Sequence, residues 1–233
     1  MGRNEQEVLS EAKRVIDQGA SMIEWRIDYL EKFADIDVVN HVMDGLGELT
    51  KDVVLLATLR TKMQGGEADI SESTLKDYYI ELARMQVADI IDVEFFELEK
   101  PEKVVSKMQE IGAVVITSHH DFDETPQKPT MEMIFEDMAK GGADIVKLAV
   151  MPQSLQDVLD LLQVTYDFST EYDGIEVASM SMGKMGVISR LCGEVFGSCI
   201  TFGTMGDASA PGQINEAELS QILNIVHNNF INS

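Results

Sequence analysis

The fold of this chain is decided by a short, almost wholly apolar stretch, Ala143-Asp144-Ile145-Val146-Lys147-Leu148-Ala149-Val150. Such a run is typical of a strand buried on both faces of a parallel sheet. In the second half of this stretch, Lys147 is the only charged residue. Burial disfavours the ammonium form, and a neutral amine can attack a ketone or aldehyde to form a Schiff base. The alternative is a lysine that reaches water past the strand end or pairs with a carboxylate.

Outward from this stretch, short apolar strands alternate with amphipathic helices along nearly the whole chain. The expected strands cover residues 22–28, 53–60, 90–95, 114–120, 143–150, 175–181 and 199–203. The expected helices cover residues 5–18, 71–86, 101–110, 129–140, 153–164, 186–196 and 215–229. Strict alternation indicates a parallel sheet with right-handed crossovers. No break in composition marks a linker, so we expect a single domain over residues 1–233.

Two fold classes share this alternation, the doubly wound sheet and the (β/α)8 barrel, and a glycine-rich phosphate-binding turn distinguishes them. A doubly wound sheet would carry a glycine-rich turn after its first strand, whereas Gly45-Leu46-Gly47 is expected in a polar loop region that follows no strand. We therefore predict a (β/α)8 TIM barrel. Because the pattern lacks one of the eight strands, the chain is expected to lack its first strand at the N-terminus, which would lie upstream of Met1.

Composition excludes several classes of partner. The formal net charge is -23, from 41 acidic and 18 basic residues, which argues against nucleic acid and against anionic membranes. Neither a signal segment nor a membrane-spanning apolar run is recognisable. Cys192 and Cys199 have no metal or redox spacing, and we expect both to be buried, reduced thiols. The predicted compartment is the cytoplasm.

Polar residues gather at the carboxyl ends of the expected strands, where barrels of this class hold their active sites. The acidic members are Glu24, Asp28, Asp92 and Glu94, and the cationic ones are Arg26, Arg60 and Lys147, with Arg190 just past a later strand. Arginine suits a carboxylate or hydroxyl-rich ligand because its planar fork donates two parallel hydrogen bonds. The alternative for each arginine is an internal ion pair, for example between Arg26 and Glu94.

Two histidines end the expected strand over residues 114–120. Neighbours on a strand point to opposite faces, so at most one of His119 and His120 can reach the barrel mouth. A histidine there suits general acid–base catalysis. The alternation argues against a metal site, and we predict none. The small-residue loop over residues 203–213 either binds phosphate or closes without a ligand.

Several stretches, in this order, resemble type I 3-dehydroquinate dehydratase over nearly the whole chain. They are Glu24-Trp25-Arg26-Ile27-Asp28, Thr58-Leu59-Arg60-Thr61, Gly65-Gly66-Glu67, Asp92-Val93-Glu94-Phe95-Phe96, His120-Asp121-Phe122, Lys147-Leu148-Ala149-Val150-Met151-Pro152, Ser179-Met180-Ser181-Met182-Gly183, Gly186-Val187-Ile188-Ser189-Arg190-Leu191, Gly193-Glu194-Val195-Phe196-Gly197-Ser198 and Ala208-Ser209-Ala210-Pro211-Gly212-Gln213. The last two stretches are the most specific.

The resemblance implies a hydro-lyase of the shikimate pathway of aromatic amino acid biosynthesis, which dehydrates 3-dehydroquinate to 3-dehydroshikimate. Lys147 would form the imine and His120 would move the protons. The substrate-binding residues would be Glu24, Arg26, Arg60, Arg190, Ser209 and Gln213. The resemblance implies no cofactor, because the lysine does that work, and it suggests a homodimer.

One position departs from the family pattern. A glutamate that orients the histidine usually precedes Gly65-Gly66-Glu67, and Gln64 stands there instead. An amide cannot stabilise an imidazolium by charge, so we expect slower proton transfer. Two other functions stay open: a class I aldolase, and a truncated or non-catalytic relative that binds quinate-like acids.

Overall fold

The computed structural model describes residues 2–205 and 210–231. The chain forms two compact units, Met1–Ser118 and His119–Ser233, and each is described by itself. Both are built from parallel strands that alternate with helices, as the sequence predicts. The single domain over residues 1–233 stays a prediction.

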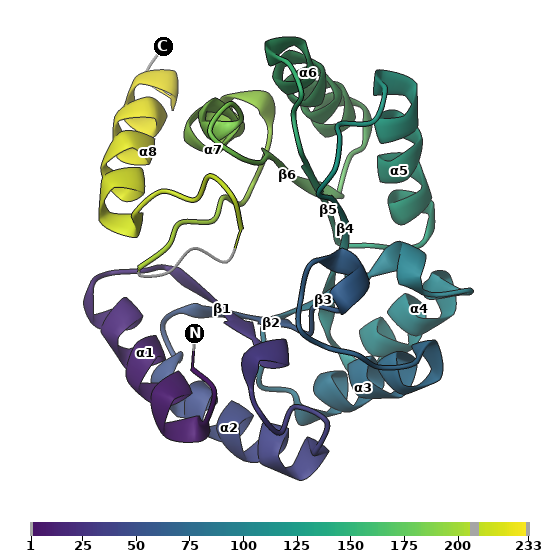
Figure 1. The fold of residues 1–233 in the computed structure, drawn as a ribbon, viewed down its shortest axis with the longest axis vertical. Helices are drawn as coiled ribbons and strands as arrows, with labels where there is room; N and C mark the ends of the chain where they lie inside the picture. The colour runs from purple at the N-terminus through teal and green to yellow at the C-terminus, as the bar shows by residue number, and fades with distance from the viewer. Residues whose placement is uncertain (1, 206–209, 232–233) are drawn as a thin grey trace. The chain divides into compact units, whose positions relative to one another are not determined.

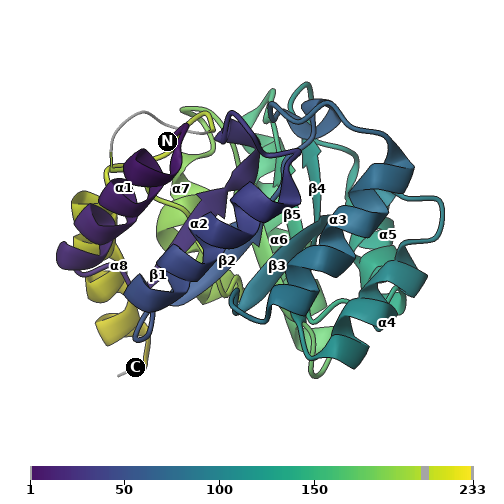
Figure 2. The same ribbon diagram turned by 90° about the horizontal axis from the view of Figure 1, so that it is seen from below.

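The first unit is a parallel sheet covered by helices. Strands β1 (Met22–Arg26), β2 (Val54–Thr58), β3 (Ile90–Glu94) and β4 (Val114–Asp121) pair in chain order. The last residues of β4, from His119 on, belong to the second unit. Helices α1 (Glu5–Asp17), α2 (Ile36–Leu49), α3 (Glu72–Met85) and α4 (Pro101–Ile111) lie side by side along one face (Figure 2).

Local chemistry sets the ends of these helices. The side chains of Asn4 and Ser71 each accept a backbone hydrogen bond from the first turn of α1 and α3, which satisfies an otherwise unpaired donor. Pro101 opens α4, where its missing N–H costs nothing. Gly112 ends α4 with a φ of 104°, a conformation that favours glycine.

The second unit repeats this plan with β5 (Ile145–Val150) and β6 (Glu176–Ser181), which pair in parallel with Lys147 opposite Ala178. Helices α5 (Lys128–Lys140) and α6 (Leu155–Glu171) pack along β5 and β6 (Figure 1). Helix α7 (Val187–Cys192), the 3-10 helix η4 (Gly193–Phe196) and α8 (Glu216–Ile231) complete it. A capping box between Ser154 and Asp157 starts α6.

Three expectations from the sequence are wrong in detail. Gly45 and Gly47 lie inside α2 rather than in a loop, because the buried apolar face of that helix outweighs the low helix propensity of glycine. No regular strand forms at 199–203 among the described residues, and isolated bridges at Ser198 and Thr204 flank this stretch. Cys192 is only half-buried and Cys199 is exposed, although both are free thiols.

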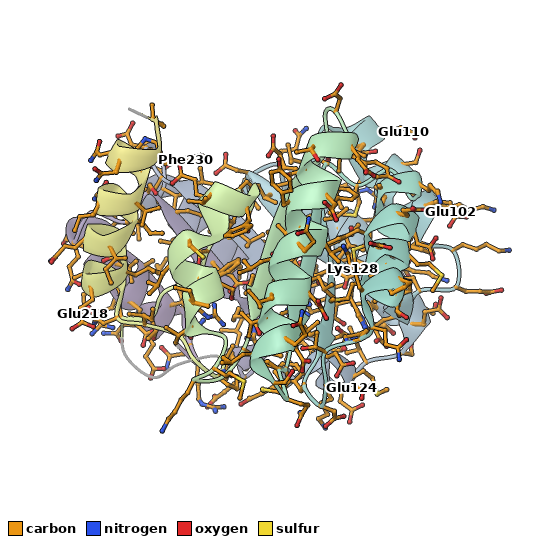
Figure 3. All side chains as sticks on the ribbon, turned by 90° about the horizontal axis from the view of Figure 1, so that it is seen from above. Glu102, Glu110, Glu124, Lys128, Glu218 and Phe230 are labelled. Carbon is orange, nitrogen blue, oxygen red and sulfur yellow. The ribbon has the colours of Figure 1, made fainter. Side chains whose placement is uncertain are left out.

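The surface carries the excess negative charge. Exposed carboxylates labelled in Figure 3 include Glu102 and Glu110 on α4 and Glu218 on α8. No described helix is long and apolar enough to cross a lipid bilayer.

Candidate active site

Lys147 is buried in the middle of β5, with 4% of its surface exposed. The direction of its side chain follows from the neighbouring strand. Ser179, on β6, shares a hydrogen bond of 2.6 Å with Thr165 of α6, so this side of β6 faces the helix. Strand register places Leu148 on that side and Lys147 on the opposite one, with Ala178 and Met180. Lys147 therefore points away from the covering helices.

Phe202 lies beside the amine of Lys147 and beside the guanidinium of Arg190. The Nζ atom of Lys147 is 4.5 Å from the centre of the Phe202 ring. The backbone carbonyl of Phe202 accepts a hydrogen bond of 3.4 Å from Nη1 of Arg190. One residue thus contacts both of the groups that the sequence nominates for the ketone and the carboxylate of a substrate.

Arg190 is a buried cation that meets no carboxylate among the described residues. It is 1% exposed, and its guanidinium donates to the carbonyls of Phe202 and Pro211 and lies 3.7 Å from the sulfur of Met180. Within residues 2–205 and 210–231, no carboxylate forms an ion pair with it, and its Nε–H meets no acceptor. Desolvation lowers the pKa of Arg190 to about 10, so the group stays charged at neutral pH. Such a site suits an anion.

Local packing sets the position of Arg190. The preceding residue, Ser189, accepts a hydrogen bond of 2.9 Å from the backbone N–H of Ser181 and donates one of 2.7 Å to the carbonyl of Gly186. These bonds fasten the start of α7 to the end of β6. Gly186 leaves no room for a side chain, because an added Cβ would lie 2.2 Å from the carbonyl oxygen of Ser181.

His120 lies near the end of β4, and its ring stacks on Phe122 with the centres 6.1 Å apart. Phe122 packs on the same small apolar cluster as Phe202, the cluster formed by Ala149, Met180 and Met182. The contacts of the second unit therefore gather Lys147, His120 and Arg190 around one apolar patch. His119 points to the opposite face of β4 from His120.

The two remaining predicted residues of the second unit, Ser209 and Gln213, belong to a loop that is only partly described. Ser209 lies outside the described residues. Gln213 is half-buried and follows Gly212, whose φ is 80°. The backbone of Gly183 donates a hydrogen bond of 3.1 Å to the carbonyl of Pro211. An added Cβ at Gly212 would lie 2.4 Å from the carbonyl oxygen of Gly183, so only glycine permits this approach.

In the first unit, the predicted substrate-binding residues lie on the sheet face opposite the helices. Glu24 accepts a hydrogen bond of 2.8 Å from the hydroxyl of Thr58. Arg26 pairs through two hydrogen bonds with Asp28, at 2.7 and 2.8 Å, rather than with Glu94. Its guanidinium also lies 4.9 Å from the ring centre of Tyr29. Desolvation opposes its charge, but Asp28 raises the pKa of Arg26 above the ordinary value.

Arg60 lies in a buried, cyclic network of hydrogen bonds with Ser118 and Asp92. Its guanidinium donates to Asp92 at 2.8 Å, to Glu94 at 3.0 Å and to the hydroxyl of Ser118 at 2.9 Å. Ser118 in turn donates to the other oxygen of Asp92 at 2.6 Å. Burial opposes the charge of Arg60, but the two carboxylates hold its pKa above the ordinary value. Burial raises the pKa of Glu94, against hydrogen bonds from Arg60 and Thr61.

Gln64 is buried in the first unit, and its amide donates a hydrogen bond of 2.8 Å to Glu97. Its expected effect on His120 stays a prediction. Sequence reasoning missed Phe202, Ser118 and Phe122 as neighbours of the predicted groups. Phe122 and Phe202 lie in or beside the stretches that were singled out, but an aromatic residue in an apolar run is most often core, so no pattern marked them.

Solved structures of similar proteins identify the class to which this fold and site belong. A 3-dehydroquinate dehydratase from Geobacillus kaustophilus HTA426 matches with a TM-score of 0.93 and 33% identity, over 97% of this chain and 88% of that one. A type I 3-dehydroquinate dehydratase from Clostridium difficile, solved with covalently modified comenic acid, matches with a TM-score of 0.92 and 40% identity, over 98% and 90%. The fold class is the (β/α)8-like TIM barrel, and the class of protein is a barrel lyase.

Sequence comparison gives the family. The model of the type I 3-dehydroquinase family matches residues 1–230. The 3-dehydroquinate dehydratase of Bacillus subtilis (strain 168) is 39% identical over 98% of this chain and 90% of that protein. The chain belongs to the type I 3-dehydroquinase family. The predicted family, fold class and enzyme class are confirmed, and the comparisons support neither the aldolase nor the non-catalytic alternative.

Proposed function

We propose that this chain dehydrates 3-dehydroquinate to 3-dehydroshikimate through a Schiff base on Lys147. The observation that carries the proposal is the placement of Lys147, a buried amine on the strand face turned away from the helices. Phe202 links it to the buried guanidinium of Arg190, which meets no carboxylate among the described residues. A ketone and a carboxylate on one small molecule match these two groups. The covalently modified acid in the Clostridium difficile relative is consistent with covalent chemistry.

The proposed reaction needs three changes at the substrate. The amine of Lys147 attacks the ketone carbon, and the carbonyl oxygen leaves as water when the imine forms. The protonated imine withdraws electrons, so His120 can remove a proton from the adjacent carbon and later give one to the leaving hydroxyl. Hydrolysis of the imine then returns the free amine. Atoms balance as the loss of one water from the substrate, without a metal or organic cofactor.

The other predicted residues would bind the substrate. Arg190 would hold the carboxylate, while Ser209 and Gln213 close over it. Glu24, Arg26 and Arg60 would bind the ring hydroxyls. The cytoplasmic location and the homodimer also stay predictions for this chain.

Reductive trapping tests the proposal directly. With 3-dehydroquinate and borohydride, we expect a stable adduct whose mass maps to Lys147. Binding of the substrate without a reducible adduct would instead indicate a non-catalytic relative. Cleavage of a carbon–carbon bond, seen as smaller products, would indicate an aldolase.

His120→Asn should lower kcat by about 10²- to 10⁴-fold, the usual contribution of a general acid–base group. The amine of Lys147 is retained, so the borohydride adduct should still form, although more slowly. Steady-state kinetics and adduct mass measure the two effects. The matched control is His41→Asn, an exposed histidine paired with Glu5, which should leave kcat unchanged. Equal losses in both variants would remove His120 from the mechanism.

Arg190→Met should weaken substrate binding and strengthen the fold. Loss of a buried charge contact costs about 2–5 kcal/mol of binding, seen as a KM increase of roughly 30-fold or more. No carboxylate of the described chain offsets the buried charge, so thermal unfolding should show a gain of about 0.5–2 kcal/mol. The exposed Arg14→Met should change neither quantity. A destabilised Arg190→Met protein with normal KM would show that the arginine is structural.

A further inference from the structure

We propose that Phe202 is a positioning residue, whose ring face holds the amine of Lys147 in place for attack while its backbone carbonyl holds Arg190. This inference rests on the proposed function, since it assigns how the amine is aimed at the ketone of the same substrate. It adds a residue that neither the sequence pattern nor the strand ends nominated.

The first observation is the geometry of the ring. The Nζ atom of Lys147 lies 4.5 Å from the centre of the Phe202 ring, within the 6 Å at which an aromatic face attracts a cation. A neutral amine keeps N–H groups that the same ring face can accept, so the contact also acts on the form that attacks the ketone. The attraction is strengthened by burial, because water competes poorly for an amine that is only 4% exposed. A lysine has four rotatable side-chain bonds, so such a contact limits where its nitrogen can move.

The second observation is the link to Arg190. The carbonyl of Phe202 accepts a hydrogen bond from Nη1 of this arginine at 3.4 Å. The ring and the carbonyl belong to one residue, so Phe202 contacts both the attacking nitrogen and the anion-binding group. A substrate whose ketone and carboxylate have a fixed separation on a ring needs these two groups at a matching spacing.

The third observation is the support beneath the ring. Phe202 packs on Ala149, Met180 and Met182, and Ala149 and Met180 lie opposite each other in β5 and β6. Phe122, which stacks on His120, packs on the same cluster. The cluster thus supports the Phe202 ring on two paired strands, and Phe122 links the same cluster to His120, the proposed proton carrier.

Fluorination of the ring separates electrostatics from packing. Phe202 is replaced by 4-fluoro-, 3,5-difluoro- and 3,4,5-trifluorophenylalanine, which weaken the negative ring face stepwise while they keep the ring. We expect the single-turnover rate of borohydride-trapped adduct formation with 3-dehydroquinate to fall stepwise, by about 3- to 30-fold over the series. Quinate has the carboxylate but no ketone, so its Kd by calorimetry should stay within about twofold.

Side-chain variants and a control complete the test. Phe202→Tyr keeps a ring face and should retain most of the rate, whereas Phe202→Leu should lose as much as the trifluorinated protein. The same fluorinated residues at Phe230, which is about half exposed on α8, should change nothing. A kcat that falls while the affinity for quinate holds separates positioning of the amine from binding of the carboxylate.

Two results would overturn the inference. A flat series would show that the ring only fills space, and a rising rate would show that its main effect is to keep the amine protonated. Failure of the proposed function looks different, because the unmodified protein would then neither turn over 3-dehydroquinate nor form an adduct.

Discussion

Lys147→Met should abolish turnover of 3-dehydroquinate and should give no borohydride adduct. Removal of a covalent nucleophile costs on the order of 10⁶ in kcat when the other groups of the site act only through it. Methionine has a similar length and no charge, so the buried position on β5 should accept it without loss of the fold. Product formation is followed by absorbance, and the adduct by mass spectrometry.

The matched control is Lys140→Met. This lysine is exposed on α5 and pairs with Glu136 at 2.7 Å, so its loss removes the same charge from the surface. We expect normal kcat, KM and adduct mass. If Lys147→Met kept more than a small fraction of the wild-type rate, a Schiff base on this residue could not be the route to product.

Arg60→Met should lower the free energy of unfolding by about 3–5 kcal/mol. The substitution leaves Asp92 and Glu94 buried without their shared cation, and both carboxylates are 0% exposed. An unpaired buried charge loses hydration without compensation, which makes this the largest stability effect that we expect. Urea unfolding at pH 7 measures it.

Arg84→Met provides the comparison on the surface. Arg84 pairs with Glu81 on the exposed side of α3, where an ion pair contributes about 0–1 kcal/mol. Arg60 is also a predicted substrate contact, so its variant should be assayed only where it is folded. A change below 1 kcal/mol for Arg60→Met would mean that water or other groups already compensate the two carboxylates.

The pH dependence of stability offers a further check on this network. Burial raises the pKa of Glu94 above its usual value, so the folded state binds this proton more tightly than the unfolded state. The stabilising contribution is therefore complete below the unfolded pKa, and it is lost as the pH rises through the folded pKa. Compared with wild type, Glu94→Gln should lack this loss of stability when urea unfolding is measured from acidic pH upward.

Much of the fold followed from local patterns. Alternating apolar strands and amphipathic helices predicted strands β1 to β6 and every described α-helix except α2, because burial of one side of each element leaves a periodic trace in the sequence. Helix α2 was missed, although Val39, Val42, Met43 and Leu46 carry the helical spacing, because its glycines indicated a loop. The stretch 199–203 has strand-like residues, but only single bridges form around it.

The site was predicted less completely. The apolar strand around Lys147 and the strand-end positions of the arginines predicted buried charged groups. The sequence did not predict which residues these groups contact. Whether an arginine is paired depends on residues that are distant in the chain. Arg60 and Arg26 turned out to be held by carboxylates, whereas Arg190 has none among the described residues.

By itself, the sequence determined the alternation of strands and helices, the family and the buried strand of Lys147, since each depends on the order of neighbouring residues. Only the tertiary structure decided that Phe202 lies against this amine, that Ser118 and Asp92 close a ring around Arg60, and that no carboxylate of the described residues pairs with Arg190. Such contacts join residues from different strands and loops, so they depend on register and side-chain direction, which local periodicity does not record.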